Sequence, residues 1–137
     1  MERNAAAAQP GAGADGLQDQ LRNLVRTHHV NLLAQIDKLD QMIAGLDAGN
    51  AACAQGVTEA EGLCHQIKGA GGSIGFADVS RAATVLDDHL KSLVALNGDV
   101  TASQIQESVD LSADLQRIAN ETTPESSTLF NADLSRQ

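Results

Sequence analysis

Apolar residues recur along most of this 137-residue chain with the spacing of α-helices. Steps of four and three residues separate the members of each apolar stripe, so that the stripe falls on one side of a helix. The clearest stripe contains Leu32, Ile36, Leu39, Ile43 and Leu46. The pattern predicts one short helix and four long ones, over about residues 17–26, 28–48, 58–74, 77–96 and 101–121.

Each apolar stripe has to be buried against another element, and the sequence offers only further helices for this purpose. Short connections between consecutive helices favour antiparallel neighbours. We therefore expect an all-α fold, an antiparallel up-down-up-down four-helix bundle with a short additional N-terminal helix.

Residues that end or begin helices stand at most of the expected boundaries. Gly49, Gly75 and Gly98 each follow an apolar stripe, as a left-handed glycine does after a helix. Thr101 and Gln104 have the spacing of a capping box, in which each side chain satisfies a backbone N–H of the other residue.

The start of the second long helix has two alternatives. Asn50 is a suitable cap, and so is Thr58, which can form a capping box with Glu61. Gly56 lies between them and is compatible with both.

The two ends of the chain differ in composition from the helical part. Residues 1–16 are rich in Ala and Gly and contain Pro10, so we expect a flexible leader. Residues 123–137 are rich in Ser and Thr and include Pro124, which predicts a C-terminal tail. Residues 17–122 then form the one domain, because a chain of this length has room for a single core.

Charge and composition exclude several classes of function. Nine Lys and Arg residues against 18 Asp and Glu residues give a net charge of −9, which repels nucleic acids and anionic membrane surfaces. Cys53 and Cys64 have no metal-like spacing, and no segment has the pattern of a membrane span or a secretory signal. We expect a cytoplasmic monomer with reduced thiols and without a nucleic-acid or membrane partner.

One turn of the second long helix carries residues that point to chemistry. On a helix, His65 shares a face with Glu61, Lys68, Gly69 and Gly72 and lies off the apolar stripe. A glycine within a helix destabilises it by about 1 kcal/mol relative to Ala. The glycines of this turn must therefore have a role other than helix stability. Their missing side chains leave the imidazole above bare backbone, next to the Lys68 ammonium.

An accessible imidazole beside a cation is suited to accepting a phosphoryl group. The ring nitrogen can attack phosphorus, the ammonium can stabilise the transferred oxygens, and no side chain blocks the approach. The chain has neither a phosphate-binding glycine loop nor a carboxylate cluster suited to Mg²⁺, so a partner would have to supply nucleotide and metal. We therefore expect no intrinsic cofactor.

The sequence His-x-x-Lys-Gly at 65–69, followed by Ser-Ile-Gly-Phe at 73–76, resembles the signature of histidine-containing phosphotransfer (HPt) domains of two-component phosphorelays. The resemblance covers about residues 17–120. It implies that His65 accepts a phosphoryl group from a receiver-domain aspartyl phosphate or a histidine kinase and passes it to a receiver aspartate. The implied partners are a response-regulator receiver domain, which would hold Mg²⁺, and a sensor histidine kinase. The chain would be a phosphoryl carrier with no autonomous kinase activity.

The resemblance also implies roles for residues around His65. Lys68 would stabilise the phosphoryl group, and Asp87 stands 22 residues after His65, where several family members have a side chain that reaches the ring. If Asp87 bonds Nδ1–H, it fixes the tautomer that leaves Nε2 as the nucleophile. The alternative is that Asp87 is a surface charge next to Asp88. The residues expected to contact the receiver are Gln66, Gly69 and Gly72.

Two other functions compete with this one. A helical adaptor or phosphate sink would bind a receiver without passing the phosphoryl group on. The dimerisation helix pair of a histidine kinase has an acidic residue after its phosphorylated His and a Pro a few positions later, whereas Gln66 follows His65 and no Pro is near. His28, His29 and His89 lack the surroundings of His65, and we interpret them as ordinary polar residues.

Overall fold

The computed structural model describes residues 12–132, and all of their regular structure is helical. The helices are α1 (Ala12–Ala44), α2 (Cys53–Ile74), α3 (Ala77–Val94), α4 (Ala102–Asn120) and the short 3-10 helix η2 (Pro124–Ser126). No strand occurs over residues 12–132, which confirms the predicted all-α class. None of these helices has both the length and the apolar character needed to cross a membrane.

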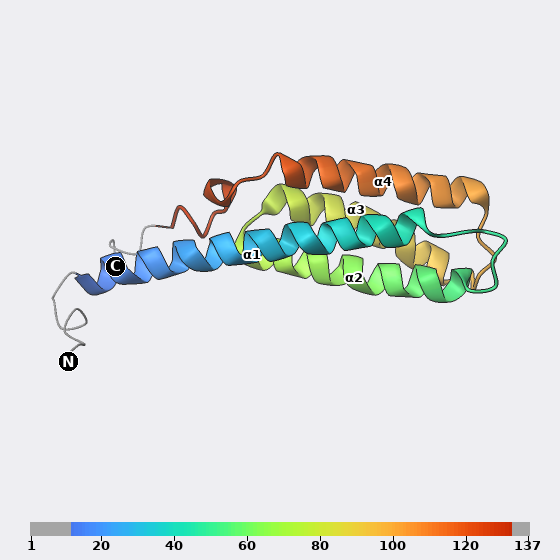
Figure 1. Ribbon diagram of the computed structural model, residues 1–137, viewed down its shortest axis with the longest axis horizontal. Coiled ribbons are helices and arrows are strands. Elements are labelled where there is room, and N and C mark those ends of the chain that lie inside the picture. The colour runs from blue at the N-terminus through green and yellow to red at the C-terminus, as the bar shows by residue number, and fades with distance from the viewer. Residues whose placement is uncertain (1–11, 133–137) are drawn as a thin grey trace.

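The four long helices lie side by side as a bundle (Figure 1). α2 contacts α1 and α3, and α4 contacts the same two helices from the other side. The α1–α2 and α3–α4 connections lie at one end of the bundle, and the α2–α3 turn lies at the other end. Each long helix therefore turns one face toward a common centre.

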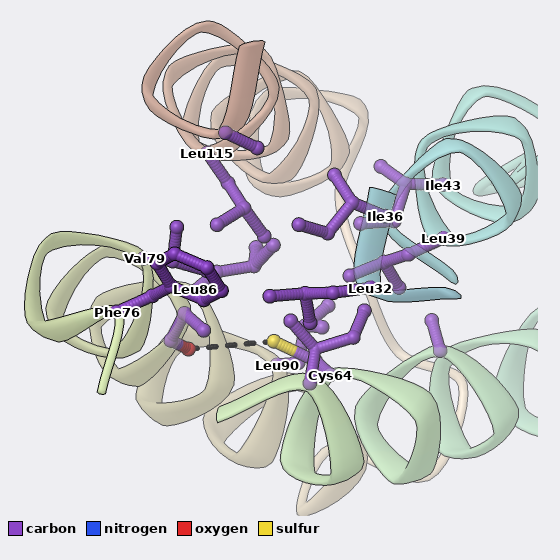
Figure 2. Close-up of a cluster of buried hydrophobic side chains, with 14 of the residues drawn as sticks. Leu32, Ile36, Leu39, Ile43, Cys64, Phe76, Val79, Leu86, Leu90 and Leu115 are labelled. Atoms are coloured by element: carbon purple, nitrogen blue, oxygen red, sulfur yellow. Dashed lines mark hydrogen bonds between the residues drawn. The ribbon is translucent and has the colours of Figure 1, made fainter. Parts of the chain in front are cut away.

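The core fills the space between the four helices (Figure 2). All four contribute buried apolar side chains to it, among them Leu32, Ile36, Leu39, Ile43, Cys64, Leu86, Leu90 and Leu115. The apolar stripe predicted for the first long helix is thus confirmed as far as Ile43. α4 also buries Ser108 and Ser112, and the Ser112 hydroxyl donates to the Asp40 carboxylate of α1 at 3.0 Å.

Both cysteines are free and buried. The Cys64 thiol donates to the Ala83 carbonyl of α3 at 3.4 Å, the dashed line in Figure 2. Burial raises the pKa of Cys64 to about 12, so the side chain stays a thiol and acts as a small apolar core residue.

One continuous helix replaces the two that were predicted at the start of the chain. The residues expected to form a separate short helix over 17–26 are the first turns of α1, so this prediction is wrong. No Gly or Pro interrupts the chain between this segment and the predicted start of the next helix. Val25 and Leu32 are both buried, so one apolar stripe runs through the predicted break.

The first helix ends earlier than expected. α1 stops at Ala44 instead of near residue 48, and Gly45, a weak helix former, is the first residue beyond it. The backbone N–H of Gly45 still bonds to carbonyls of the last turn. Gly49 does not have a positive φ, so the left-handed helix end predicted there is wrong.

The second long helix begins at Cys53, about five residues before Thr58. Neither predicted cap occupies the N-cap position, which belongs to Ala52 without a side-chain hydrogen bond. Asn50 lies in the turn before the helix. Its Oδ1 accepts a hydrogen bond from the Ala52 backbone N–H at 2.7 Å and so stabilises this turn. Thr58 lies inside α2, and its hydroxyl donates to the Ala54 carbonyl, the local bond that a helix interior offers to threonine.

Gly75 closes α2 as predicted, with a φ of +90°. The third long helix ends at Val94 with Ala95 as its C-cap, before the predicted stop, and Gly98 has a φ of +93° further along the connection. Thr101 and Gln104 form the capping box at the start of α4, with each side chain bonded to the backbone N–H of the other residue.

The C-terminal segment packs against the bundle over residues 123–132. Ser127 and Phe130 are buried. The guanidinium groups of Arg22 and Arg26 on α1 lie 5.3 and 5.2 Å from the centroid of the Phe130 ring. This part of the expected tail is therefore attached to the bundle, because Phe130 finds an apolar and cationic surface that the sequence does not reveal.

Helical structure extends beyond the expected domain of 17–122 at both ends. α1 begins at Ala12, within the expected leader, and η2 follows residue 123. Residues 1–11 and 133–137, which carry the remainder of the expected leader and tail, lie outside the described residues.

Candidate functional site

His65 lies on the exposed face of α2, beside a buried carboxylate from α3. Asp87 is fully buried, and its Oδ2 lies 3.3 Å from His65 Nδ1. The imidazole itself is 61% exposed. With the ring proton on Nδ1, this N–H donates to Asp87 and the lone pair lies on Nε2. Asp87 is thus not a surface charge, whereas the adjacent Asp88 is exposed.

The Lys91 ammonium contacts the same carboxylate. Lys91, one turn further along α3, places Nζ 3.3 Å from Asp87 Oδ2. Burial acts to raise the pKa of Asp87, but its interactions with Glu61, His65 and Lys91 outweigh this effect, so the pKa lies below its ordinary value of 3.8. Asp87 is therefore a charged acceptor for the Nδ1–H of His65 at neutral pH.

Glu61 adds a second carboxylate to the cluster, one turn before His65 on α2. One oxygen each of Glu61 and Asp87 and one ring nitrogen of His65 lie within 4.8 Å of one another. The neighbouring Asp87 carboxylate, and partial burial after it, raise the pKa of Glu61 above its ordinary value of 4.5. Two adjacent carboxylates thus have pKa values that are displaced in opposite directions.

The three glycines around His65 have different surroundings. A β-carbon at Gly69 would meet no atom of a neighbouring element within 4 Å, so the surface one turn after His65 is open. A β-carbon at Gly72 would lie 3.3 Å from Ser80 Oγ, and one at Gly71 would lie 3.4 Å from the backbone of the same residue. Gly69 therefore provides the bare surface that the sequence predicts, while Gly71 and Gly72 also allow α2 to approach α3.

Lys68 and Gln66 flank this open surface. The backbone carbonyl of Lys68 accepts a hydrogen bond from the Ser80 hydroxyl at 3.2 Å, which ties this turn of α2 to α3. Within the described residues, the Lys68 ammonium forms no ion pair with an acidic side chain. Gln66 is exposed beside a shallow depression between α1 and α2.

His89 has the opposite surroundings to His65. Its ring is mostly buried between α3 and α4. Nε2 lies 3.2 Å from the Gln104 carbonyl, and Nδ1 lies 3.6 Å from Glu107 Oε2. Both ring nitrogens therefore face oxygens of α4, and His89 lies at the contact between the two helices.

His29 also makes a structural contact. Its Nε2 lies 3.0 Å from the Thr122 carbonyl, and its ring packs against Phe76 with 5.4 Å between ring centroids. His28, by contrast, is exposed. Of the four histidines, His65 is the one that combines an exposed ring with a buried carboxylate.

Lys91 is the member of the site that the sequence analysis missed. A signal was present, because Asp87 and Lys91 are opposite charges four residues apart on one helix and such residues are neighbours. Pairs of this kind are common on helix surfaces, so the spacing alone does not separate an exposed pair from one that holds a buried carboxylate.

No family model, curated protein or solved structure matches this chain. The function therefore has to follow from the arrangement of His65, Asp87 and the residues around them.

Proposed function

We propose that this chain is a histidine-containing phosphotransfer protein of a two-component phosphorelay, with His65 as the phosphoryl carrier. It takes the group from a receiver-domain aspartyl phosphate or from a histidine kinase and passes it to a receiver aspartate. Its fold is then an antiparallel up-down-up-down four-helix bundle, and the alternation of the connections between the two ends of the bundle supports this assignment (Figure 1).

The observation that carries the proposal is the unequal burial of His65 and Asp87. A nucleophilic imidazole needs one nitrogen with an accessible lone pair and a second nitrogen that holds the proton. Asp87, buried and 3.3 Å from Nδ1, supplies a fixed acceptor for that proton. The exposed ring then presents Nε2 to a partner in the reactive tautomer.

The transfer step follows from this geometry. The Nε2 lone pair attacks phosphorus of a receiver aspartyl phosphate, the N–P bond forms, and the P–O bond to the aspartate breaks to release its carboxylate. The phosphorylated ring gains positive charge, which the Asp87 carboxylate stabilises through Nδ1–H. The reverse step returns the phosphoryl group to a receiver aspartate. Mg²⁺ belongs to the receiver in both directions.

Two further features fit a partner that brings the phosphate. The Lys68 ammonium is on the face of His65 and can pair with phosphoryl oxygens. Gly69 leaves room for another protein to approach the ring, and Gly72 and Gln66 continue the same exposed surface. The monomer docks its receiver over this face of α2.

The test is to mix the purified chain with a phosphorylated receiver and to follow the labelled phosphoryl group. We expect wild type to accept the label in a bond that is lost in acid and survives base, as a phosphoramidate does. His89→Gln, which changes a histidine outside the site, should accept the label equally well. His65→Gln should accept none.

A specific complex with the receiver but no label on the wild-type chain would contradict the proposal. The chain would then be a helical adaptor that binds a receiver. Label on His65→Gln would also contradict it, because the acceptor would lie elsewhere.

A further inference from the structure

Three metal-ligating side chains meet beside the His65 ring. Glu61 and His65 are four residues apart on α2 and share one face, and Asp87 reaches them from α3. One ligand atom from each lies within 4.8 Å of the other two. Glu61 and His65 are the more exposed of the three side chains, so they are the ones free to rotate toward a shared ion.

A buried oxygen at the base of this cluster lacks a partner. Asp87 is fully buried, and its Oδ1 has no hydrogen bond with any residue that the structure describes. Such an oxygen has lost water without compensation, which is unfavourable for a charged group. A cation bound by both oxygens of the Asp87 carboxylate would remove this deficit, so the orphaned oxygen itself points to a ligand.

We propose that Glu61, His65 and Asp87 form a binding site for a divalent transition-metal ion of the Zn²⁺ class. Two ligands of a tetrahedral ion with bonds of about 2.0–2.1 Å lie about 3.3 Å apart. His65 Nδ1 and Asp87 Oδ2 have this separation, 3.3 Å. One imidazole with two carboxylates suits Zn²⁺, whereas Mg²⁺ and Ca²⁺ prefer oxygen ligands alone. The exposed side of the cluster leaves a further position to water.

Lys91 is the group that the metal ion displaces. Its ammonium lies 3.3 Å from Asp87 Oδ2, one of the two oxygens that would bind the metal, and its side chain is half exposed. An ammonium and a divalent ion repel each other at one carboxylate, so the flexible lysine side chain moves into solvent when the metal binds. Removal of the Lys91 charge therefore strengthens metal binding.

The metal also blocks phosphorylation of His65, a consequence that rests on the proposed function. A neutral imidazole that binds a metal through Nδ1 carries its proton on Nε2. Nε2 then has no lone pair with which to attack phosphorus. Zn²⁺ and the phosphoryl group therefore exclude each other, and the metal inhibits transfer.

A calorimetric titration of the metal-free full chain with ZnCl₂ tests the site. We expect one Zn²⁺ per wild-type chain. Glu61→Gln and His65→Gln should weaken binding by at least about tenfold, because loss of an outer-shell partner of a metal ligand alone costs about 10–100-fold. His28→Gln, which changes an exposed histidine outside the cluster, should leave the affinity unchanged. No binding, or equal affinity in wild type and both cluster variants, would overturn the site.

Lys91→Met tests whether the ion contacts Asp87, and this substitution leaves the buried Asp87 itself unchanged. We expect this variant to bind Zn²⁺ more tightly than wild type does. Unchanged or weaker binding would contradict an ion on the Asp87 carboxylate.

Phosphoryl transfer measured with and without Zn²⁺ separates the two proposals. We expect wild type to accept the phosphoryl group only when it is metal-free, and Glu61→Gln, which keeps His65, to accept it in both conditions. Zn²⁺ binding without phosphoryl acceptance in either condition would refute the proposed function and leave the metal site standing. Acceptance without Zn²⁺ binding would refute the metal site alone. Equal acceptance by Zn²⁺-loaded and metal-free wild type would refute the mutual exclusion.

Discussion

Two histidine–carboxylate pairs of this bundle have opposite burial. In the pair on the α2–α3 face, the His65 ring is 61% exposed and its partner Asp87 is fully buried. In the pair at the α3–α4 contact, the His89 ring is 12% exposed and its partner Glu107 is 64% exposed. In the first pair the ring faces solvent and the carboxylate is buried. In the second pair the ring is buried and the carboxylate faces solvent.

The unequal burial of the two rings explains why we assign the proposed chemistry to His65 and not to His89. Asp87 holds one nitrogen of His65 and the exposed ring presents the other, whereas the ring of His89 is mostly buried and both of its nitrogens face oxygens of α4. A partner protein can therefore reach a nitrogen of His65 but not one of His89. Three variants of the first region are therefore matched with controls in the second region or on another surface, and a fourth variant changes the second region itself.

A bulky residue on the open surface beside His65 should have the largest effect on transfer. Gly69→Trp should reduce transfer from a phosphorylated receiver to near background, because the indole would cover the approach to the ring. The fold should persist, since a β-carbon at Gly69 meets no neighbouring element. Ser103→Trp, on an exposed residue of α4 near His89, should transfer normally. Normal transfer by Gly69→Trp would show that the receiver does not use this surface.

Loss of the cation beside His65 should have the next largest effect. Lys68→Ala should slow transfer by about 100-fold in both directions without abolishing it, because removal of one group that stabilises transferring charge costs about 10²–10³ in rate. Lys38→Ala, at an exposed lysine of α1, should transfer at the wild-type rate. Rapid-quench measurements of both directions distinguish the two variants, and equal rates would remove Lys68 from the mechanism.

Neutralising the buried carboxylate should have a smaller effect. Asp87→Asn should slow transfer by about 10–100-fold, because an amide can present either a donor or an acceptor to Nδ1 and no longer fixes the tautomer. Glu107→Gln, the matching change in the second pair, should leave the rate unaltered. Circular dichroism checks that both variants stay folded. Equal transfer rates in the two folded variants would contradict the positioning role of Asp87.

The smallest effect on transfer is expected for the second pair itself. His89→Gln should transfer normally but lose about 1 kcal/mol of the free energy of unfolding, the typical worth of a buried hydrogen bond. Thermal unfolding should show this as a Tm lower by roughly 4 °C. His65→Gln, which changes an exposed side chain, should leave Tm nearly unchanged. The reverse pattern of Tm values would mean that His65 has the structural role.

Much of the fold could be predicted because it rests on local rules. The apolar stripe from Leu32 to Ile43, the left-handed Gly75 and the capping box of Thr101 and Gln104 are all set by residues close together in sequence. The prediction of a C-terminal tail failed because contacts between distant residues determine the position of that segment. Phe130 is buried under arginines more than a hundred residues earlier, so composition alone predicted a tail.

The candidate site divides in the same way. His65, Lys68 and Gly69 could be chosen from their spacing on one helix. The burial of Asp87 stayed open, because α3 sets it by packing against α2, and the sequence favoured Asp87 over the exposed Asp88 only through the resemblance. Lys91 was missed for the same reason, since its importance depends on the burial of its partner.

The most direct test of the central claim is a nitrogen NMR spectrum of the histidine rings in ¹⁵N-labelled chain, before and after phosphorylation. Before phosphorylation, we expect His65 to be the Nδ1–H tautomer, with its lone pair on Nε2. After it, phosphorus should couple to Nε2 of His65, and the other three histidines should keep their signals. Phosphorus on Nδ1, or on any other histidine, would contradict the account, because Asp87 would then not select the reactive nitrogen.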